Sequence, residues 1–543
     1  MESKTLENLR VLIVDDQRSF QLMFKGILYS MGATNVAFAP TGEQALAKCI
    51  NMDYDVLFVD YHLGTGKNGK QLLEDLREKK LLKPSSIFMI VTGENTVPMV
   101  MSAVELEPDD YLIKPFSQRV LRSRIQKIQH KKVKLNALYQ ALYDEQGDTI
   151  IELCQQEIST EGRYQQFCKR VLAETFIKHR KLDAAQQVLS QNLEQHRSGW
   201  ALVLQAQIYF DQGEFQRCLE LCEEALESNR YFAEAFDLKA KAYMAMAQPD
   251  EALQCILNAS EIAPHSIKRQ YLMMEIARKV HDMPRQVQAS KQLYEITRRS
   301  LKQDVIHLQN YIRTVIEAAM ESEEPQQKNR YQQETMIALQ RARLDESMIK
   351  DIDFDLFEVL CQARLESLSG QQFQAKRTFA TVADLLHGQE HSLADAVLLL
   401  NQIGEYEEAD SLKQKISKET LDNPVLDAII QRQTDITVSR KEYFAQYNKE
   451  GIRLYKAGLF SEAAKQFEQA LELAPMNTGA ALNYIQSLLQ LLSQPQHFKV
   501  GDAFERCRKA FRVVDNMPLP EHHRVRYQEL LSRYEKIRTE RRR

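Results

Sequence analysis

The sequence has no long hydrophobic run, few glycines and prolines, and no excess of one sign of charge. No apolar stretch reaches the roughly 18–20 residues that a membrane helix needs, and the opening segment MESKTLENLR has no apolar signal core. The 543 residues include 71 basic and 75 acidic side chains, so the net charge of −4 favours neither nucleic acid nor membrane as a partner. We therefore expect a cytoplasmic protein.

The eight cysteines are scattered, without the close pairs that are typical of metal sites. Cys218 and Cys222 are one helical turn apart, but they lie inside a repeat described below, so we expect reduced thiols throughout. The chain has no P-loop, no cyclic-nucleotide signature and no nucleophile–base arrangement, which argues against an enzyme. The low content of glycine (18) and proline (14), together with a length too great for one core, favours two or three mostly helical domains.

Five short apolar runs predict the strands of an α/β domain in the first 120 residues. The run Val11–Val14 is continuously apolar, which is typical of a strand buried on both faces. Strands that alternate with helices form a parallel sheet covered on both faces, so we expect a doubly wound α/β fold. The other predicted strands are Asn35–Ala39, Val56–Val59, Ile87–Val91 and Tyr111–Ile113, and the predicted helices are Phe20–Met31, Thr41–Ile50, Gln71–Glu78 and Thr96–Val104.

Acidic residues follow the first and third of these strands. Asp15 and Asp16 end the first strand and Asp60 ends the third, and such strands flank the point where a doubly wound sheet binds ligands. Three carboxylates within about 5 Å repel one another by roughly 3 kcal/mol per pair at an effective dielectric near 20. A dication would neutralise them, and ligation by oxygen alone suits Mg²⁺.

Two further polar residues end the fourth and fifth strands. Thr92 is placed to donate its hydroxyl to an anion, and Lys114 is placed to bring an ammonium group to it. Taken singly, each of these residues has an ordinary explanation as part of a turn or loop. Together, a nucleophilic carboxylate, a metal ion, a hydroxyl and a lysine form a site that accepts a phosphoryl group.

Residues 8–125 resemble the receiver domain of a two-component response regulator. The resemblance implies that Asp60 is the phosphorylated aspartate, that Asp16 is a direct Mg²⁺ ligand, and that Asp15 is its acidic neighbour. It also implies that the backbone carbonyl of His62 completes the metal site.

The same resemblance assigns roles to residues near the last two strands. Thr92 and Lys114 would bind the phosphoryl group, and Tyr111 would be the aromatic switch residue. The Lys114–Pro115 bond is often cis in this family, an isomer that is essentially confined to proline. The chain departs from the family in the loop after the acceptor aspartate, which is one residue longer and has Gly64 where many members have proline.

The segment Ser117–Tyr143 contains seven basic residues and no acidic one. It predicts either a coiled-coil dimer or a helix that packs its apolar stripe on the following helices, and the interruption by Lys132 favours the second. Its basic face and the tail Arg541–Arg543 also leave nucleic-acid binding open, although no recognition motif accompanies them. The apolar stripe recurs every seven residues, at Leu121, Ile128, Leu135 and Leu142.

Two consecutive segments of the remaining chain repeat the same residue types at a period of 34. Small residues at fixed positions allow paired helices to approach, so the pattern resembles the tetratricopeptide repeat, whose concave surface binds protein or peptide. Ala206, Tyr209, Cys218 and Ala225 are followed by Ala240, Tyr243, Ala252 and Ala259, and a later copy has Gly451, Gly458, Phe460, Ala463, Phe467, Ala470 and Pro475.

The repeats extend beyond these copies in a more degenerate form. Leu172 and Ala184 predict a preceding unit that starts near Gln165, and Glu321–Lys328 predicts a loop between subarrays. Asp422–Pro424 and the polar stretch Gln431–Arg440 predict another boundary. The expected domains are a receiver at 1–125, a basic helical connector at 117–145, tetratricopeptide-like repeats at 145–320, further degenerate repeats at 330–440, and a repeat with C-terminal helices at 441–543.

These resemblances imply a response regulator of a two-component phosphorelay, with protein binding as its output instead of DNA binding. A sensor histidine kinase or a phosphotransfer protein would phosphorylate Asp60 in the presence of Mg²⁺. Three alternatives stay open: a regulator that binds a sensor kinase and inhibits transfer to another regulator, a constitutive scaffold that the receiver only dimerises, and a nucleic-acid-binding regulator. We expect no turnover beyond slow autodephosphorylation.

Overall fold

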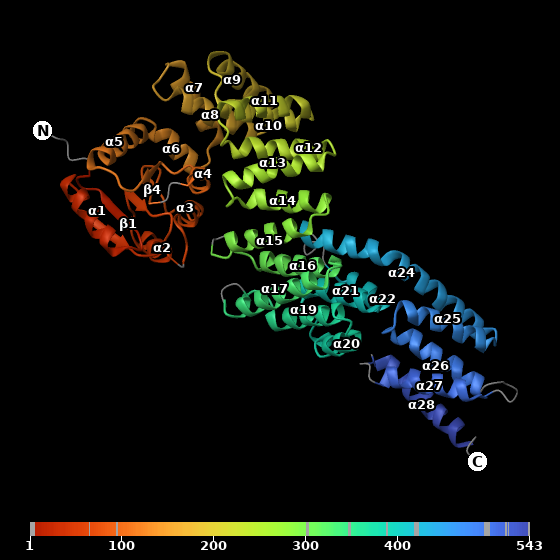
Figure 1. Ribbon diagram of the computed structural model, residues 1–543. Coiled ribbons are helices and arrows are strands. Elements are labelled where there is room, and N and C mark those ends of the chain that lie inside the picture. Colours follow the sequence, from red (N-terminus) through yellow and green to blue (C-terminus); the bar gives the residue numbers. More distant parts are fainter. Residues whose placement is uncertain are drawn as a thin grey trace. The chain divides into compact units, whose positions relative to one another are not determined.

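A five-stranded parallel sheet forms the centre of the N-terminal domain (Figure 1). The strand order β2-β1-β3-β4-β5 shows that the chain starts inside the sheet and adds strands on both sides. This order confirms the predicted doubly wound fold. The strands are β1 (Arg10–Val14), β2 (Asn35–Ala39), β3 (Val56–Val59), β4 (Ile87–Thr92) and β5 (Asp110–Ile113).

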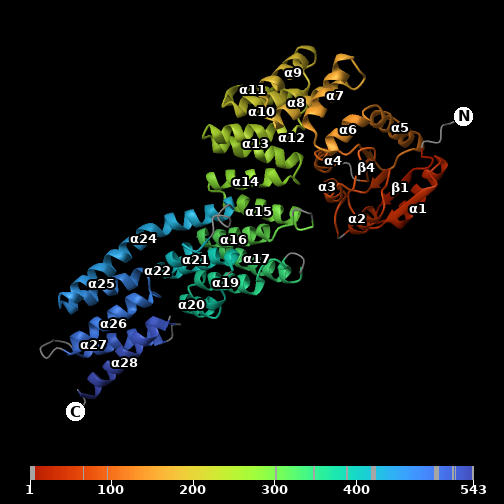
Figure 2. The same cartoon turned by 180° about the vertical axis from the view of Figure 1, so that it is seen from behind.

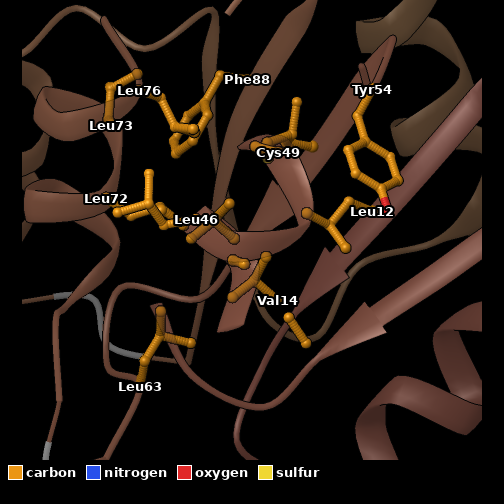
Figure 3. Close-up of a cluster of buried hydrophobic side chains, with 14 of the residues drawn as sticks. Leu12, Val14, Leu46, Cys49, Tyr54, Leu63, Leu72, Leu73, Leu76 and Phe88 are labelled. Atoms are coloured by element: carbon orange, nitrogen blue, oxygen red, sulfur yellow. The ribbon is translucent and has the colours of Figure 1, made fainter. Parts of the chain in front are cut away.

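Helices cover both faces of the sheet because successive strand residues point to opposite sides. Leu12 and Val14 of β1 pack toward α2 and α3, in the cluster that Figure 3 shows. Val11 and Ile13 pack on the other face, with residues of α1 and α5. The helices of this domain are α1 (Arg18–Ser30), α2 (Gly42–Asn51), α3 (Gly69–Glu78), α4 (Val97–Val104) and α5 (Gln118–Lys134).

The basic connector forms two helices, α5 and α6 (Asn136–Tyr143), that meet at Leu135. Leu121 and Ile125 are buried under the sheet. Leu135 and Leu138 are buried against the following helices, α7 (Gly147–Ser159) and α8 (Gln165–Lys178). The apolar stripe is therefore used within the chain, as the second interpretation of this segment predicted.

Two lysines of the basic face are also engaged within the chain. The Lys132 side chain is buried, and its Nζ donates to the carbonyl of Ser86 and, over 2.9 Å, to Asp109 Oδ2. The Lys131 Nζ lies 3.4 Å from the centre of the Phe167 ring. These contacts weaken the nucleic-acid hypothesis for this face, and the tail Arg541–Arg543 lies outside the described residues.

The helices after the connector form regular pairs. Helices α8, α10, α12 and α14 begin at Gln165, Gly199, Ala233 and Ile267, so each pair starts 34 residues after the previous one. The predicted unit near Gln165 and the two central units are thus present as helix pairs. After α7 and α8, the helices of this array are α9 (Leu182–Gln195), α10 (Gly199–Asp211), α11 (Phe215–Ser228), α12 (Ala233–Ala245), α13 (Pro249–Ile262), α14 (Ile267–Lys279) and α15 (Met283–Thr297).

The chain divides into two units, Met1–His307 and Leu308–Arg543, and all the elements above belong to the first. The second is helical throughout its described part. Its helices are α16 (Val305–Glu321, which starts just before the division), α17 (Pro325–Arg343), α19 (Phe354–Leu368), α20 (Gln372–Ala380), the 3-10 helix η1 (Ala383–Leu386), α21 (Glu390–Ile403), α22 (Tyr406–Lys413), α24 (Pro424–Lys456), α25 (Phe460–Leu473), α26 (Thr478–Ser493), α27 (Val500–Asp515) and α28 (Glu521–Glu540) (Figure 2).

Two predicted boundaries differ from the structure. The polar stretch Gln431–Arg440 lies inside α24, a continuous helix of 33 residues, so the chain has no break between residues 440 and 441, whereas Pro424 of the other proposed boundary is the first residue of this helix. The loop expected in Glu321–Lys328 is present as residues 322–324 between α16 and α17, but the division into two units falls earlier, at His307–Leu308. Polar composition misled the prediction because a long helix with one solvent-facing side is also rich in polar residues.

The structure describes residues 6–64, 66–93, 96–299, 303–345, 349–386, 389–416, 423–493, 500–515, 519 and 521–540. All eight cysteines lie in these ranges, are buried, and form no disulfide. Across the same ranges, the chain contains no helix whose length and apolar character would let it span a membrane.

The late repeat copy depends on a close approach of two helices at Gly451. A Cβ atom at this position of α24 would lie 2.7 Å from Cε1 of Phe467, which is only 1% exposed and has little room to move. We expect Gly451→Ala to destabilise the second unit by about 1–3 kcal/mol, measured by thermal unfolding. Gly26→Ala in α1 is the control, because nothing lies within 4 Å of its Cβ position and the gain in helix propensity is the same. Equal effects of the two substitutions would contradict the packing argument.

Candidate functional site

Two carboxylates and one lysine meet at the carboxyl edge of the sheet. Asp15 follows β1 and Asp60 follows β3, and these strands are neighbours. The Nζ of Lys114, which follows β5, lies 2.6 Å from Asp15 Oδ2 and 2.6 Å from Asp60 Oδ2. Asp15 is 1% exposed and Asp60 is 7% exposed, so both acids are held out of water beside this cation.

Main-chain and side-chain groups fix the orientation of both acids. Asp15 Oδ1 accepts a hydrogen bond of 2.8 Å from the backbone N–H of Gln17, and Asp60 Oδ1 accepts one of 3.1 Å from that of His62. The Gln21 side chain donates to the Asp15 carbonyl over 2.6 Å. Each carboxylate therefore turns its Oδ2 atom toward Lys114.

Burial and neighbouring charges act in opposite directions on Asp60. Burial raises the pKa of its carboxyl above the ordinary value, the hydrogen bond and charge of Lys114 lower it, and the charge of Asp15 raises it. The Lys114 ammonium also lies 3.7 Å from the centre of the Phe20 ring, which is favourable for a cation. The lysine thus relieves the repulsion that the sequence predicted between the acids.

The other predicted residues near the last strands lie around the same edge. Thr92 ends β4, is 1% exposed, and its carbonyl accepts a 2.7 Å hydrogen bond from the Lys114 backbone N–H. Tyr111 of β5 is half-buried and packs against the cluster between the sheet, α2 and α3. The Lys114–Pro115 bond is cis, as the resemblance implied.

The predicted metal ligands are less closely gathered than the sequence suggested. Asp16 is exposed and faces the loop after β3, with its Oδ2 3.8 Å from the position of a Cβ on Gly64. The His62 side chain is exposed. Within the described ranges, no group of three His, Cys, Asp or Glu side chains is close enough to hold a metal ion. The donor set still fits Mg²⁺, because the Asp15 and Asp60 oxygens already converge on one cation, the lysine ammonium.

Three contributors to the site were not predicted. Phe20 was assigned to the packing of a helix and Gln21 was given no role, although both lie in the first turn of the helix that follows the two acids. Gly69 lets the loop return against the acceptor residue, because a Cβ there would lie 2.4 Å from the Asp60 carbonyl oxygen. The unusual density of glycine in this loop was the available signal.

Two parts of the chain are similar to known proteins. Residues 11–126 match the family model of the response regulator receiver domain, and residues 448–492 match a tetratricopeptide repeat model. The chemotaxis protein CheY of Pseudomonas aeruginosa is 32% identical over 120 residues, which cover 22% of this chain and 95% of CheY. The transcriptional regulatory protein CpxR of Klebsiella pneumoniae is 35% identical over 119 residues, which cover 22% of this chain and 48% of CpxR. A solved CheY-like receiver domain protein from Methanospirillum hungatei is 28% identical and covers 24% of this chain and 98% of its own, with a TM-score of 0.22.

The match to CheY extends over nearly the whole of that protein, and it coincides with the sheet domain that holds the site. The repeat model coincides with the helices around Gly451 that the period of small residues predicted. The chain therefore belongs to the response regulators, with a receiver domain at its N-terminus joined to tetratricopeptide-type helical repeats.

Proposed function

We propose that Asp60 is the phosphoryl acceptor of a two-component phosphorelay. A carboxylate oxygen of Asp60 attacks the phosphorus of a phosphorylated histidine, the new O–P bond forms, and the P–N bond breaks with its electron pair leaving on the imidazole. The observation that supports this role most directly is the position of Asp60 Oδ2, 2.6 Å from the ammonium of Lys114. That cation is placed to bind the oxygens of the incoming group.

Asp15, Asp16, Asp60 and the carbonyl of His62 would hold the Mg²⁺ ion. Bound there, the ion supplies positive charge that neutralises phosphoryl oxygens. The residues of the chain do the rest: the Gln17 and His62 amides orient the acids, and Thr92 donates its hydroxyl to the phosphoryl group.

Phosphorylation adds a charge of about −1.5 to −2. Lys114 would then leave Asp15 for the phosphoryl oxygens, since their charge exceeds that of one carboxylate. Thr92 would turn toward the same oxygens, and Tyr111 would pack further into the cluster that it already contacts. The Asp60 site would act as a switch, with no turnover beyond its own phosphotransfer and slow dephosphorylation.

The output of the switch would be protein binding through the repeats. A cavity of about 200 Å³ lies between α13, α14 and α15 in the first unit. Leu257 and Met273 give it an apolar wall, and Glu261 and Arg285 add charges of both signs. This size and lining suit one side chain of a bound peptide.

The test is phosphorylation of the full chain by acetyl phosphate, with and without Mg²⁺. We expect the intact mass to increase by one phosphoryl group when Mg²⁺ is present, and peptide mapping to place it on Asp60. Chelation by EDTA should prevent the increase, because the donor oxygens are left without a neutralising dication. Incorporation that is independent of Mg²⁺, or that maps to another residue, would refute the proposed site.

A further inference from the structure

The loop that follows Asp60 and the first turn of α3 are attached to the helical repeats of the same unit. Lysine, arginine and glutamine side chains make these contacts, and most acceptors are carbonyls at or just beyond the ends of α13 and α15. Such carbonyls carry the partial negative charge of a helix C-terminus and favour cationic donors. The hydrogen bonds are Lys67 Nζ to the Arg299 carbonyl, Lys70 Nζ to the His265 carbonyl at 2.5 Å, Gln71 Nε2 to the Ile296 carbonyl at 3.0 Å, and Arg299 Nη1 to the Gly66 carbonyl at 3.4 Å.

A buried ion pair makes a second attachment, between α4 of the receiver and the repeats. The Arg269 guanidinium is 1% exposed and binds Asp237 through two hydrogen bonds of 2.8 and 2.7 Å. Its Nη2 also donates to Glu105 Oε1 over 2.8 Å. Beside it, Met101 packs against a small apolar cluster of the repeats. The receiver is therefore docked through its loop, α3 and α4.

Both ends of the docked loop contact the acceptor residue Asp60, one through a hydrogen bond and the other through close packing. At its start, the His62 amide donates to Asp60 Oδ1. At its end, Gly69 packs against the Asp60 carbonyl, and its amide donates to the Tyr61 carbonyl over 2.8 Å. Lys70 comes next in the chain and already contacts the repeats.

Gln71, in the first turn of α3, contacts the loop and the repeats at the same time. Gln71 accepts a hydrogen bond of 3.1 Å from the Asn68 amide, which completes the N-terminal cap of α3. Its Nε2 donates at the same time to the Ile296 carbonyl. A shift of the loop that opened this cap would also break the contact with α15.

We propose that helices α13–α15 sense the state of Asp60 through this loop, and that phosphorylation releases the receiver from them. The inference rests on the proposed function, because it requires Asp60 to be the acceptor. Asp60 is 7% exposed and the loop packs directly against it, so a phosphoryl group displaces the His62 contact and moves the loop. That movement withdraws Lys67, Lys70 and Gln71 from their carbonyl partners.

The coupling acts in both directions, since two linked equilibria affect each other by the same factor. If phosphorylation weakens docking, then a variant with weakened docking binds a phosphoryl mimic more tightly. Glu105→Lys places a cation against Arg269 and disfavours docking without changing the acceptor site. Glu78→Lys is the matched control, because Glu78 is an exposed residue of the same domain with the same change of charge. Glu105→Gln removes the charge alone and serves if the lysine variant does not fold.

The experiment uses the full chain with beryllofluoride and Mg²⁺, which mimic the phosphoryl group, and follows hydrogen exchange. We expect the mimic to lower protection around His265 and Ile296 in the wild type. Glu105→Lys should show this low protection without the mimic and bind the mimic about five-fold more tightly or better. Glu78→Lys should behave as the wild type.

The outcomes separate the two proposals. If the mimic changes exchange around Asp60 and Thr92 but not around His265 and Ile296, the docking inference is overturned and the acceptor site stands. Unchanged affinity in Glu105→Lys would overturn it as well. If the mimic changes exchange nowhere in the receiver, the proposed acceptor fails and the docking inference fails with it.

Discussion

Replacing Asp60 with asparagine is expected to abolish phosphorylation of the full chain by acetyl phosphate and Mg²⁺. The amide has nearly the volume of the carboxylate, but it is a poor nucleophile and a weaker metal ligand. Lys114 retains Asp15 as a partner, at 2.6 Å, so its position in the site is preserved. Intact mass spectrometry measures the effect directly.

The structure also predicts that Asp60→Asn does not unfold the receiver. Burial raises the pKa of Asp60, so the folded state loses stability as pH rises above the ordinary carboxyl pKa, and the full cost of the ionised carboxylate is present once pH exceeds the raised pKa. Asparagine removes that cost, and the thermal midpoint should equal or exceed that of the wild type. Asp53→Asn is the control, because Asp53 forms an exposed pair with Lys83 on the same domain. Phosphoryl incorporation by Asp60→Asn at the wild-type level would refute the assignment of the acceptor.

The strands and their polar ends were predictable because they depend on local sequence. A buried parallel strand must be continuously apolar, which placed β3 at its observed bounds. The position of Asp15 and Asp60 at one edge then follows from topology alone. The direct contact of Lys114 with both acids did not follow, since it depends on the reach of a side chain from β5.

The flanking repeats were harder to predict because their turns lack the usual residue. Gly213 adopts a positive φ of 80° between α10 and α11, and the sequence marks it clearly. Arg180 and His281 adopt φ values of 58° and 57° at the corresponding turns of the flanking pairs. Only glycine takes this conformation without steric cost, so the packing of the helices determines these turns, and a search for glycine overlooks them.

The docking of the receiver lies beyond what the sequence reveals. Its loop and the first turn of α3 donate mainly to backbone carbonyls, such as those of His265 and Ile296, and every residue has a carbonyl. The extra residue in the loop was visible as a departure from the family. The contact of Gln71 with α15 became apparent only in the structure, because it joins residues that are more than 200 positions apart in the sequence.

The second unit holds two buried arginines whose loss of partners should have the largest effect on stability. Arg313 is 1% exposed and binds Asp395, which is fully buried, through Nε at 3.0 Å and Nη2 at 2.6 Å. Arg364 is fully buried, donates to Glu317 Oε1 over 2.6 Å, and has its Nη1 3.8 Å from Asp395 Oδ1. The four charges balance, and they join α16, α19 and α21.

Asp395→Ala is expected to destabilise the second unit by about 3–5 kcal/mol, because it leaves Arg313 as a buried charge without its carboxylate. Denaturant unfolding, followed by circular dichroism, measures the change. Asp410→Ala is the matched control: it removes an aspartate from the exposed pair with Lys441 in the same unit, and should cost about 0–1 kcal/mol.

A double replacement separates the net contribution of the ion pair to the free energy of unfolding from the destabilisation caused by leaving one of its charges unpaired. Arg313→Met with Asp395→Leu removes both charges and fills much of their volume, so it should recover most of the stability that Asp395→Ala loses. Such recovery would mean that the pair selects the arrangement of α16 and α21 more than it stabilises it. If the double variant is as unstable as Asp395→Ala, the pair of Arg313 and Asp395 itself stabilises the unit. The second pair, Arg364 with Glu317, must then depend on the first, because the Arg364 guanidinium lies in the same buried space as Asp395.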